Sequence, residues 1–263
     1  MTQNKPMVSC LLPAGNNFGG IARSILCYQE QSWPNKQLVV INYGDEDLAP
    51  LLDEIPSDEL RYIHHQQDGV FSMATALNRG LDHADGSYVA YWSETDWYHP
   101  ERIRCQLEAM NSGEDFSLLD GVIVHLDHPE YVHHPYIQDK SGGYAESLLV
   151  RYFPELRFPV KGKNPLRSVM KNVPEQQISK LDTSFAWLMV HGLEGEAGSK
   201  PYKAFLAGLR NSPKSLVWTG WLKMRGRNLA NHPRFKLSSE ARSSFYLYLR
   251  ESQKLGLIAS LSE

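Results

Sequence analysis

Four polar residues, Ser93, Glu94, Thr95 and Asp96, follow directly on the strand-like apolar run at 88–92. Two carboxylates with a hydroxyl between them can hold a divalent cation, because hard cations prefer oxygen ligands. The same residue types also cap loops by hydrogen-bonding to nearby backbone. The segment therefore predicts either a site for a metal or an anionic ligand, or a capped and solvated loop.

The chain on either side of this segment alternates between two hydrophobic periods. Short apolar runs predict strands at 8–13, 37–42, 61–65, 86–93 and 120–126. Amphipathic patterns predict helices at 21–30, 73–84 and 100–110, with a further short helix at 47–55. This alternation favours an α/β fold with a mostly parallel sheet and helices on both faces.

Ligands of such sheets bind outside the carboxyl ends of the strands, where acidic and amide side chains gather in this sequence. They are Asn16, Asn42, Asp45, Glu46, Asp47, Asp68, Glu94 and Asp96. So many carboxylates repel one another unless a cation or solvent shields them. We therefore expect this rim of the sheet to bind a ligand.

The patterns are weaker beyond residue 140. The segment 144–158 predicts a strand or a short helix with a turn, and 181–193 is apolar enough for a buried helix. The segment 238–260 predicts a C-terminal helix, with Ser238 or Ser239 as its N-cap.

Charge is unevenly spread along the 263 residues, although the net charge is only −3. Residues 1–139 contain 7 Lys/Arg and 21 Asp/Glu, a balance of −14, whereas residues 140–263 contain 20 and 9, a balance of +11. We therefore expect two functional halves, 1–139 and 140–263, packed as one domain with a helical extension.

The composition, 42% hydrophobic and 22% charged, is that of an ordinary soluble globular protein. No apolar run is long enough to span a membrane and the N-terminus lacks a signal pattern, so we expect a cytoplasmic protein. Cys10, Cys27 and Cys105 lie in apolar patterns and predict buried thiols rather than disulfides. Four histidines have metal-like spacing: His125, His128, His133 and His134. We expect them instead in the loop between the fifth predicted strand and the next element.

The motifs argue against several common nucleotide sites, and a nucleotidyltransferase-like enzyme remains a weaker alternative. The loop after the first strand, Gly15–Gly20, lacks the G-x-G-x-x-G spacing, and the second strand ends in Asn42 rather than in an acid for a ribose. The sequence contains neither a P-loop lysine motif nor a G-x-S-x-G elbow. A nucleotidyltransferase would need a basic residue in the first loop, yet none precedes Arg23 there.

The first 110 residues resemble glycosyltransferase family 2, the inverting nucleotide-sugar transferases with a GT-A fold. The resemblance rests on VSCLLPAGNN (8–17), ILCYQEQSWPNKQLVVIN (25–42) and DGVFSMATALNRGLDHADGSYVAYWSETDWYHPERI (68–103), and more loosely on ESLLVR (146–151). It implies transfer of a sugar with inversion from a nucleotide-sugar donor to a glycan or lipid-linked hydroxyl, in bacterial surface polysaccharide synthesis.

The resemblance also implies roles for individual residues. The donor would be held by Pro13, Asn16, Asn42, Tyr43, Asp68, Ser93, Glu94 and Thr95. Asp96 would hold Mg²⁺ or Mn²⁺ on the donor diphosphate, and His191 is an alternative metal contact. Asp182 best matches the catalytic base that deprotonates the acceptor, although it fits a helix N-cap equally well.

The sequence departs from the family at this site. Ser93 and Thr95 stand where the family has acids, and Asn42-Tyr43-Gly44 stands where it usually has Asp-Asp-Gly. Three alternatives follow. The donor is bound without a metal by cationic side chains, Asp96 or Glu94 shifts to hold the metal, or the domain is inactive and binds a nucleotide sugar or a partner protein.

Basic residues in the second half could replace a metal. Lys161, Lys163, Arg167 and Lys171 lie within 11 residues that hold no acid, and 214–236 adds six more Lys/Arg around Trp218 and Trp221. Arginine forks suit phosphate oxygens, and basic residues beside tryptophans suit a membrane surface that carries a lipid-linked acceptor. A solvated basic face is the plain alternative. We expect no nucleic-acid partner.

Overall fold

The computed structural model of the protein describes residues 5–64, 72–110, 113–128, 131–162, 164–193 and 236–258, with the isolated residues 217, 221 and 224. Asp68, Lys163 and Trp218 lie outside the described residues, as does most of the basic segment 214–236.

Four parallel strands form the first half of the sheet. Their order is β3 (Leu60–His64), β2 (Lys36–Asn42), β1 (Val8–Ala14) and β4 (Tyr88–Tyr91). β1 is buried along its whole length, and its alternate side chains enter two separate cores. Cys10 and Leu12 pack into one core, whereas Leu11 packs into the other. Because side chains alternate along a strand, a continuous apolar run fits a strand that is covered on both faces.

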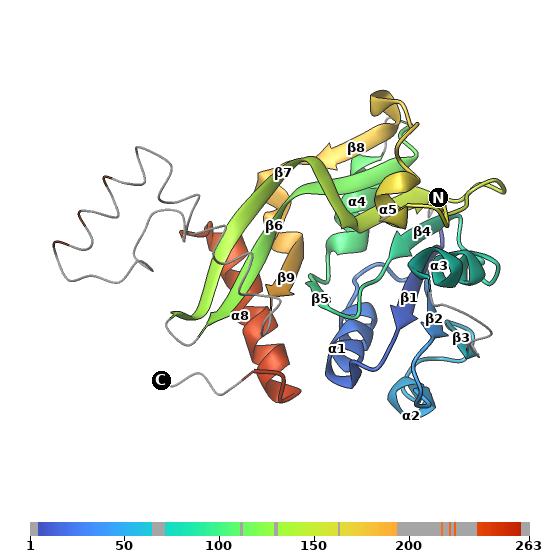
Figure 1. Ribbon diagram of the computed structural model, residues 1–263, viewed down its shortest axis with the longest axis horizontal. Coiled ribbons are helices and arrows are strands. Elements are labelled where there is room, and N and C mark those ends of the chain that lie inside the picture. Colours follow the sequence, from blue (N-terminus) through green and yellow to red (C-terminus); the bar gives the residue numbers. More distant parts are fainter. Residues whose placement is uncertain are drawn as a thin grey trace.

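Helices cover both faces of these strands, as predicted. They are α1 (Phe18–Gln29), α2 (Ala49–Leu52), α3 (Met73–Leu81) and α4 (Arg102–Ala109). Ile21 and Ile25 of α1 pack in the same core as Cys10, whereas Leu77 of α3 packs in the core that contains Leu11. Figure 1 shows α1 and α3 beside the β1–β3 strands, with α2 at their carboxyl ends.

The sheet becomes mixed beyond β4. The strands of this half are β5 (Asp96–Tyr98), β6 (Phe116–His128), β7 (Tyr131–Arg151), β8 (Ile178–Leu181) and β9 (Met189–Leu193). β7 runs antiparallel to β4 and forms a long hairpin with β6, while β8 and β9 lie parallel to β6. β5 pairs antiparallel with β9 at the edge of the sheet (Figure 1). β7 runs through residue 140, so residues on both sides of that position build one sheet.

The helix predicted at 181–193 is wrong. The segment forms a short 3₁₀ helix, η2 (Thr183–Leu188), and then the strand β9. β9 is bonded to β5 on one side and to β6 on the other, so its backbone groups find partners that an isolated apolar pattern cannot reveal. Of the two alternatives for 144–158, the strand is observed, because Tyr144–Arg151 belongs to β7.

The loop predicted for the histidines is also wrong, because β6 and β7 continue as strands through these positions. His125 is fully buried in β6, and its Nδ1 atom lies 2.8 Å from the hydroxyl of Tyr248. Tyr248 belongs to α8 (Ser239–Lys254), the predicted C-terminal helix, which Ser238 caps by accepting a hydrogen bond from the Ala241 amide. His125 therefore helps to dock α8 on the sheet.

Short elements complete the described chain: α5 (Pro165–Ser168) and the 3₁₀ helix η1 (Glu175–Gln177). Cys10, Cys27 and Cys105 are buried free thiols, as predicted. Among the helices in the described ranges, none has the length and apolar character needed to cross a lipid bilayer.

Candidate functional site

The segment Ser93–Thr95 forms a loop between β4 and β5, and it is capped by its own side chains. The hydroxyls of Ser93 and Thr95 lie 2.9 Å apart, and the Thr95 amide donates to the Ser93 hydroxyl at 3.1 Å. Helix α1 holds the same loop from below, because Arg23 donates to the Thr95 carbonyl at 2.7 Å and Ser24 donates to the Ser93 carbonyl. The two hydroxyls therefore fix the loop, and this part of the segment matches the capped-loop alternative.

Glu94 joins this loop to the ends of β1 and β2. Its carboxylate accepts a hydrogen bond from the Gly15 amide at 2.8 Å and a long one from the Tyr43 hydroxyl at 3.5 Å. Burial raises the pKa of Glu94, and these two hydrogen bonds offset only part of the rise. Burial and the nearby Glu94 carboxylate also raise the pKa of Tyr43, to about 12.

Tyr43 lies flat against the backbone of Gly15. A Cβ atom on Gly15 would be 2.9 Å from Cε2 of the Tyr43 ring, so only glycine allows this approach. The Tyr43 amide donates to the Ala14 carbonyl at 2.9 Å, which joins the loops after β1 and β2. The predicted donor residue Tyr43 thus presents an aromatic ring at the carboxyl edge of the sheet.

Of the two predicted amide residues, only Asn16 reaches the exposed rim. Asn42 is fully buried, and it donates to the Glu46 carbonyl at 2.7 Å and accepts from the Gly44 amide at 2.9 Å, so it shapes the loop after β2. Asn16 pairs with Asp45 in the same rim: its Nδ2 donates to Oδ2 of Asp45 at 3.1 Å, and its Oδ1 accepts from the Asp45 amide at 3.0 Å. Pro13 is buried within β1.

Asp96 and His191 face one another across the β5–β9 pair. Oδ1 of Asp96 lies 2.6 Å from Nδ1 of His191, and the two residues are register partners. Asp96 is 1% exposed, whereas the side chain of His191 is 33% exposed. Burial alone would lower the pKa of His191, but the charge and hydrogen bond of Asp96 outweigh it, so the pKa is raised.

The second carboxylate oxygen of Asp96 is buried and has no hydrogen-bond partner among the described residues. A buried anionic oxygen without a partner is costly, so this atom fits a bound cation. No group of three His, Cys, Asp or Glu side chains in the described ranges is arranged around one point for a metal. This suits a Mg²⁺-like ion, which one or two carboxylates hold together with water and substrate phosphates.

Buried aromatic rings and a buried cation surround Asp96. The pKa of both Tyr91 and Tyr98 is raised, mainly by burial and secondly by the charge of Asp96. The guanidinium of Arg102 is fully buried, donates twice to the Tyr91 carbonyl at 3.2 Å and lies 4.0 Å from the centre of the Tyr98 ring. These buried groups exclude water from the inner side of the Ser93–Thr95 loop, and electrostatic interactions are stronger where water is excluded.

Charged side chains of β7 act on the exposed side of His191. Glu146 raises the pKa of His191, whereas Lys140 lowers it. The pKa of Lys140 is itself lowered, mainly by burial and secondly by the charge of Arg167. Arg167 donates to the Gly143 carbonyl at 3.0 Å, and its charge acts on Lys140, so one predicted cation lies near Lys140. Lys161 and Lys171 are exposed, and no contact joins either of them to this group in the described part of the chain.

Asp182 is the N-cap of η2, which is the plain alternative for this residue. Its carboxylate accepts hydrogen bonds from the amide and the hydroxyl of Ser184, and these bonds lower its pKa. Its negative charge also helps to raise the pKa of Asp120. No hydrogen bond or ion pair in the described chain joins Asp182 to Asp96 or Glu94, so its role as a base stays a prediction.

The comparison with known proteins agrees with this architecture. The profile of the family described as Glycosyl transferase family 2 matches residues 9–169. An uncharacterized glycosyltransferase of Rickettsia felis is 31% identical over 108 residues, which are 40% of this chain and 17% of that protein. The amylovoran biosynthesis glycosyltransferase AmsB of Erwinia amylovora is 29% identical over 104 residues, which are 38% of this chain and 34% of that protein. The chain thus spans about a third or less of the length of these relatives.

Two solved structures share the fold at low sequence identity. The mannosyltransferase PcManGT of Pyrobaculum calidifontis, in complex with GDP-Man and Mn²⁺, has a TM-score of 0.56 and 14% identity, covering 98% of this chain and 77% of that chain. Residues 1–349 of TarS from S. aureus, in complex with UDP-GlcNAc, give a TM-score of 0.55 and 14% identity. The match covers 95% of this chain and 81% of that chain. The fold is therefore GT-A, and with the family profile matching more than half of its residues, the chain belongs to glycosyltransferase family 2.

Proposed function

We propose that the protein transfers a sugar, with inversion, from a nucleoside diphosphate donor to a hydroxyl group of a glycan or lipid-linked acceptor. The observation that carries the proposal is the buried second oxygen of Asp96, which has no partner among the described residues, while the first oxygen bonds to His191 at the donor edge of a GT-A sheet. Two solved structures of the same fold contain nucleotide sugars, and one of them also contains Mn²⁺.

The rim formed by Gly15, Asn16 and Tyr43 would hold the nucleoside. The Tyr43 ring offers an aromatic face on which a base can stack, and its close packing against Gly15 holds the ring in place. The pair of Asn16 and Asp45 offers both a donor and an acceptor at the exposed edge of the same rim. Ser93 and Thr95 would contribute through the shape of the loop, because their hydroxyls bond to each other.

Asp96 and His191 would hold Mg²⁺ or Mn²⁺, which would neutralise the charge that develops on the leaving diphosphate. Lys140 lies close enough to His191 to lower its pKa, and Arg167 lies close enough to Lys140 to lower that pKa in turn, so both would add positive charge on this side of the pair. If no metal is required, these two cations would bind the diphosphate oxygens themselves. Either arrangement leaves the nucleoside diphosphate as a stabilised leaving group.

Inversion follows from a single displacement. Asp182, the predicted base, would take the proton of the acceptor hydroxyl, whose oxygen then attacks the anomeric carbon from the face opposite the diphosphate. The new carbon–oxygen bond forms as the bond to the diphosphate breaks, and the nucleoside diphosphate departs with the electron pair. The name of AmsB supports an acceptor from bacterial polysaccharide synthesis. Peripheral membrane contact through the basic second half would bring a lipid-linked acceptor within reach.

Calorimetric titration with UDP-, GDP- and dTDP-sugars, with and without Mn²⁺, tests this proposal. We expect one donor to bind, and Asp96→Asn to weaken its metal-dependent binding. Asp82→Asn is the matched control, because Asp82 is exposed and its ion pair in the described part of the chain is with Arg157. Metal-independent binding that falls in Lys140→Gln or Arg167→Gln, but not in Lys171→Gln, would assign the diphosphate to the cations. Binding without transfer to any acceptor would support an inactive domain, and no binding would refute the donor site.

A further inference from the structure

A pocket lies where η2, the end of β5 and the first half of α8 meet. It has a volume of about 350 Å³. Its described lining residues are His99, Trp187, Glu240, Ser243, Ser244 and Leu247. None of them belongs to the candidate donor site. The volume is near the lower end of the range of roughly 300–1,000 Å³ that is typical of small-molecule sites.

This pocket and the donor site lie on opposite faces of β5. Successive side chains of a strand point to opposite faces, so Asp96 and Tyr98 share one face and Trp97 the other. Trp97 donates to Glu251 of α8 at 2.6 Å, which identifies its face as the α8 side. His99 continues the strand through a 3.0 Å bond from its amide to the Leu188 carbonyl, and its ring packs against Trp187 beside α8. The pocket is therefore a separate site.

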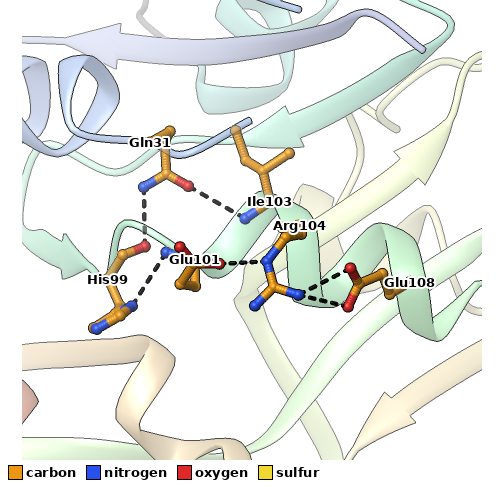
Figure 2. Close-up of polar contacts among 6 residues, drawn as sticks. All are labelled: Gln31, His99, Glu101, Ile103, Arg104 and Glu108. Atoms are coloured by element: carbon orange, nitrogen blue, oxygen red, sulfur yellow. Dashed lines mark hydrogen bonds and ion pairs between the residues drawn. The ribbon is translucent and has the colours of Figure 1, made fainter. Parts of the chain in front are cut away.

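His99 is held with one ring nitrogen occupied and the other available. Figure 2 shows the Glu101 amide donating to Nδ1 of His99, at 3.1 Å, and Gln31 donating to the His99 carbonyl, at 3.0 Å. Burial lowers the pKa of His99, and the charge of Glu101 offsets only part of this. A neutral ring whose Nδ1 accepts carries its proton on Nε2. In the described part of the chain, Nε2 has no hydrogen-bond partner, so His99 can donate one.

The remaining lining residues offer an aromatic surface and acceptors. The Trp187 ring stands perpendicular to His99, at 88° with 4.6 Å between ring centres, and Trp187 is half-buried. Ser244 is 3% exposed, and its hydroxyl has no hydrogen-bond partner among the described residues. The Ser243 hydroxyl donates to the Ser239 carbonyl at 3.0 Å, which leaves its lone pairs free. Glu240 adds an exposed carboxylate at the mouth of the pocket.

We propose that this pocket binds a neutral saccharide of roughly one or two rings, the size that a cavity near 300 Å³ admits. The Trp187 ring packs against the apolar C–H face of a sugar. The His99 Nε2–H donates to one sugar hydroxyl, while Ser244 and Glu240 accept from others. No Lys or Arg is among the described lining residues, and Glu240 repels anions, so a phosphorylated ligand does not fit. The proposal does not depend on sugar transfer at Asp96.

Saturation-transfer difference NMR with maltose, cellobiose, N,N′-diacetylchitobiose and α-1,2-mannobiose tests the proposal on the full chain. We expect at least one of these disaccharides to bind. Trp187→Ala should weaken that binding by about tenfold or more, equivalent to about 1.4 kcal/mol. Glu240→Gln should weaken it several-fold. Because Glu240 is exposed, this second variant keeps its fold even if Trp187→Ala does not.

Two control variants show where the saccharide sits. Tyr246 is 60% exposed on α8 and does not line the pocket, so Tyr246→Ala should bind the disaccharide as the wild type does. Asp96→Asn should also leave this binding unchanged. The proposal is overturned if none of the four disaccharides binds, if Glu240→Gln binds with wild-type affinity, or if Asp96→Asn abolishes binding.

Discussion

Asp96 and His191 are 95 positions apart in the sequence, yet their side chains meet at 2.6 Å across the β5–β9 pair. One oxygen of Asp96 is thereby engaged, and the other remains buried without a partner in the described chain. The loop before Asp96 is closed by its own hydroxyls. The residues of the Ser93–Asp96 segment thus have different roles: Ser93 and Thr95 fix the loop, and Asp96 keeps one oxygen available for a ligand.

The first prediction concerns this oxygen. Asp96→Asn keeps the size of the side chain and removes its charge, so we expect kcat for sugar transfer to fall by about 10²–10³-fold, as when one charge-stabilising group is removed. Donor titrations and initial rates on the same preparation would measure the effect. The exposed variant Asp82→Asn should keep the wild-type rate. Wild-type kcat in Asp96→Asn would remove Asp96 from the mechanism.

The second prediction concerns the close approach of α1 to the motif loop. A Cβ atom on Gly20 would lie 2.1 Å from the Glu94 carbonyl oxygen and 2.5 Å from Nδ2 of Asn17. We expect Gly20→Ala to destabilise the protein by about 1–3 kcal/mol, because backbone must shift to make room. The same shift displaces Glu94, so donor affinity should fall as well.

Gly142→Ala is the matched control for that change. The nearest atom to a Cβ at Gly142 is Nη1 of Arg167, at 3.9 Å, which is an ordinary contact. Its unfolding midpoint should therefore equal that of the wild type in thermal or denaturant melts. Equal midpoints for Gly20→Ala and the wild type would show that α1 does not constrain the loop.

The third prediction concerns the hydrogen bond that docks α8 on β5. Trp97 is 1% exposed and donates from its indole nitrogen to Glu251 at 2.6 Å. Glu251→Ala leaves this buried donor without a partner, so we expect a loss of about 1–3 kcal/mol in the free energy of unfolding. Glu251→Gln keeps a carbonyl acceptor and should lose much less. Equal losses in the two variants, measured by urea unfolding, would show that the hydrogen bond itself is not what stabilises α8.

Much of the first half of the fold could be predicted from the sequence. β1 and β2 are continuous apolar runs and α3 carries a 3.6-residue period, and each element lies where its pattern placed it. β9 could not be predicted in this way. Its five residues belong to an apolar segment that fits a buried helix equally well, and only pairing with β5 and β6 selects the strand.

The candidate site was predictable only in part. The sequence predicts Asp96 as the metal ligand and His191 as an alternative metal contact. Nothing local indicates that the two residues are register partners. Lys140 was missed because it lies in the first part of β7, which had no recognised strand pattern. Glu146 lies in the segment predicted as a strand or a short helix, but nothing local indicates that its charge acts on His191. Asn42 was expected to face the donor, but a buried amide at a strand end can equally well bond to its own loop, as it does here.

The last prediction concerns pH and His99. Burial lowers the pKa of His99 in the folded protein, whereas an unfolded histidine titrates near about 6.5. Between these two values the unfolded state binds more protons than the folded state, so the contribution of His99 to stability falls as the pH drops below about 6.5. The charge of Glu101 reduces the effect without reversing it.

His99→Gln removes this titration and keeps a polar side chain. We expect the wild type to lose more stability than His99→Gln between pH 7.5 and pH 5, in urea unfolding at each pH. His191 titrates in both proteins with a raised pKa, so its opposite contribution cancels in the difference between them. Parallel stability curves would mean that the His99 ring accepts a proton as easily in the folded protein as in the unfolded chain, which contradicts a neutral, Nε2-protonated His99 in the pocket.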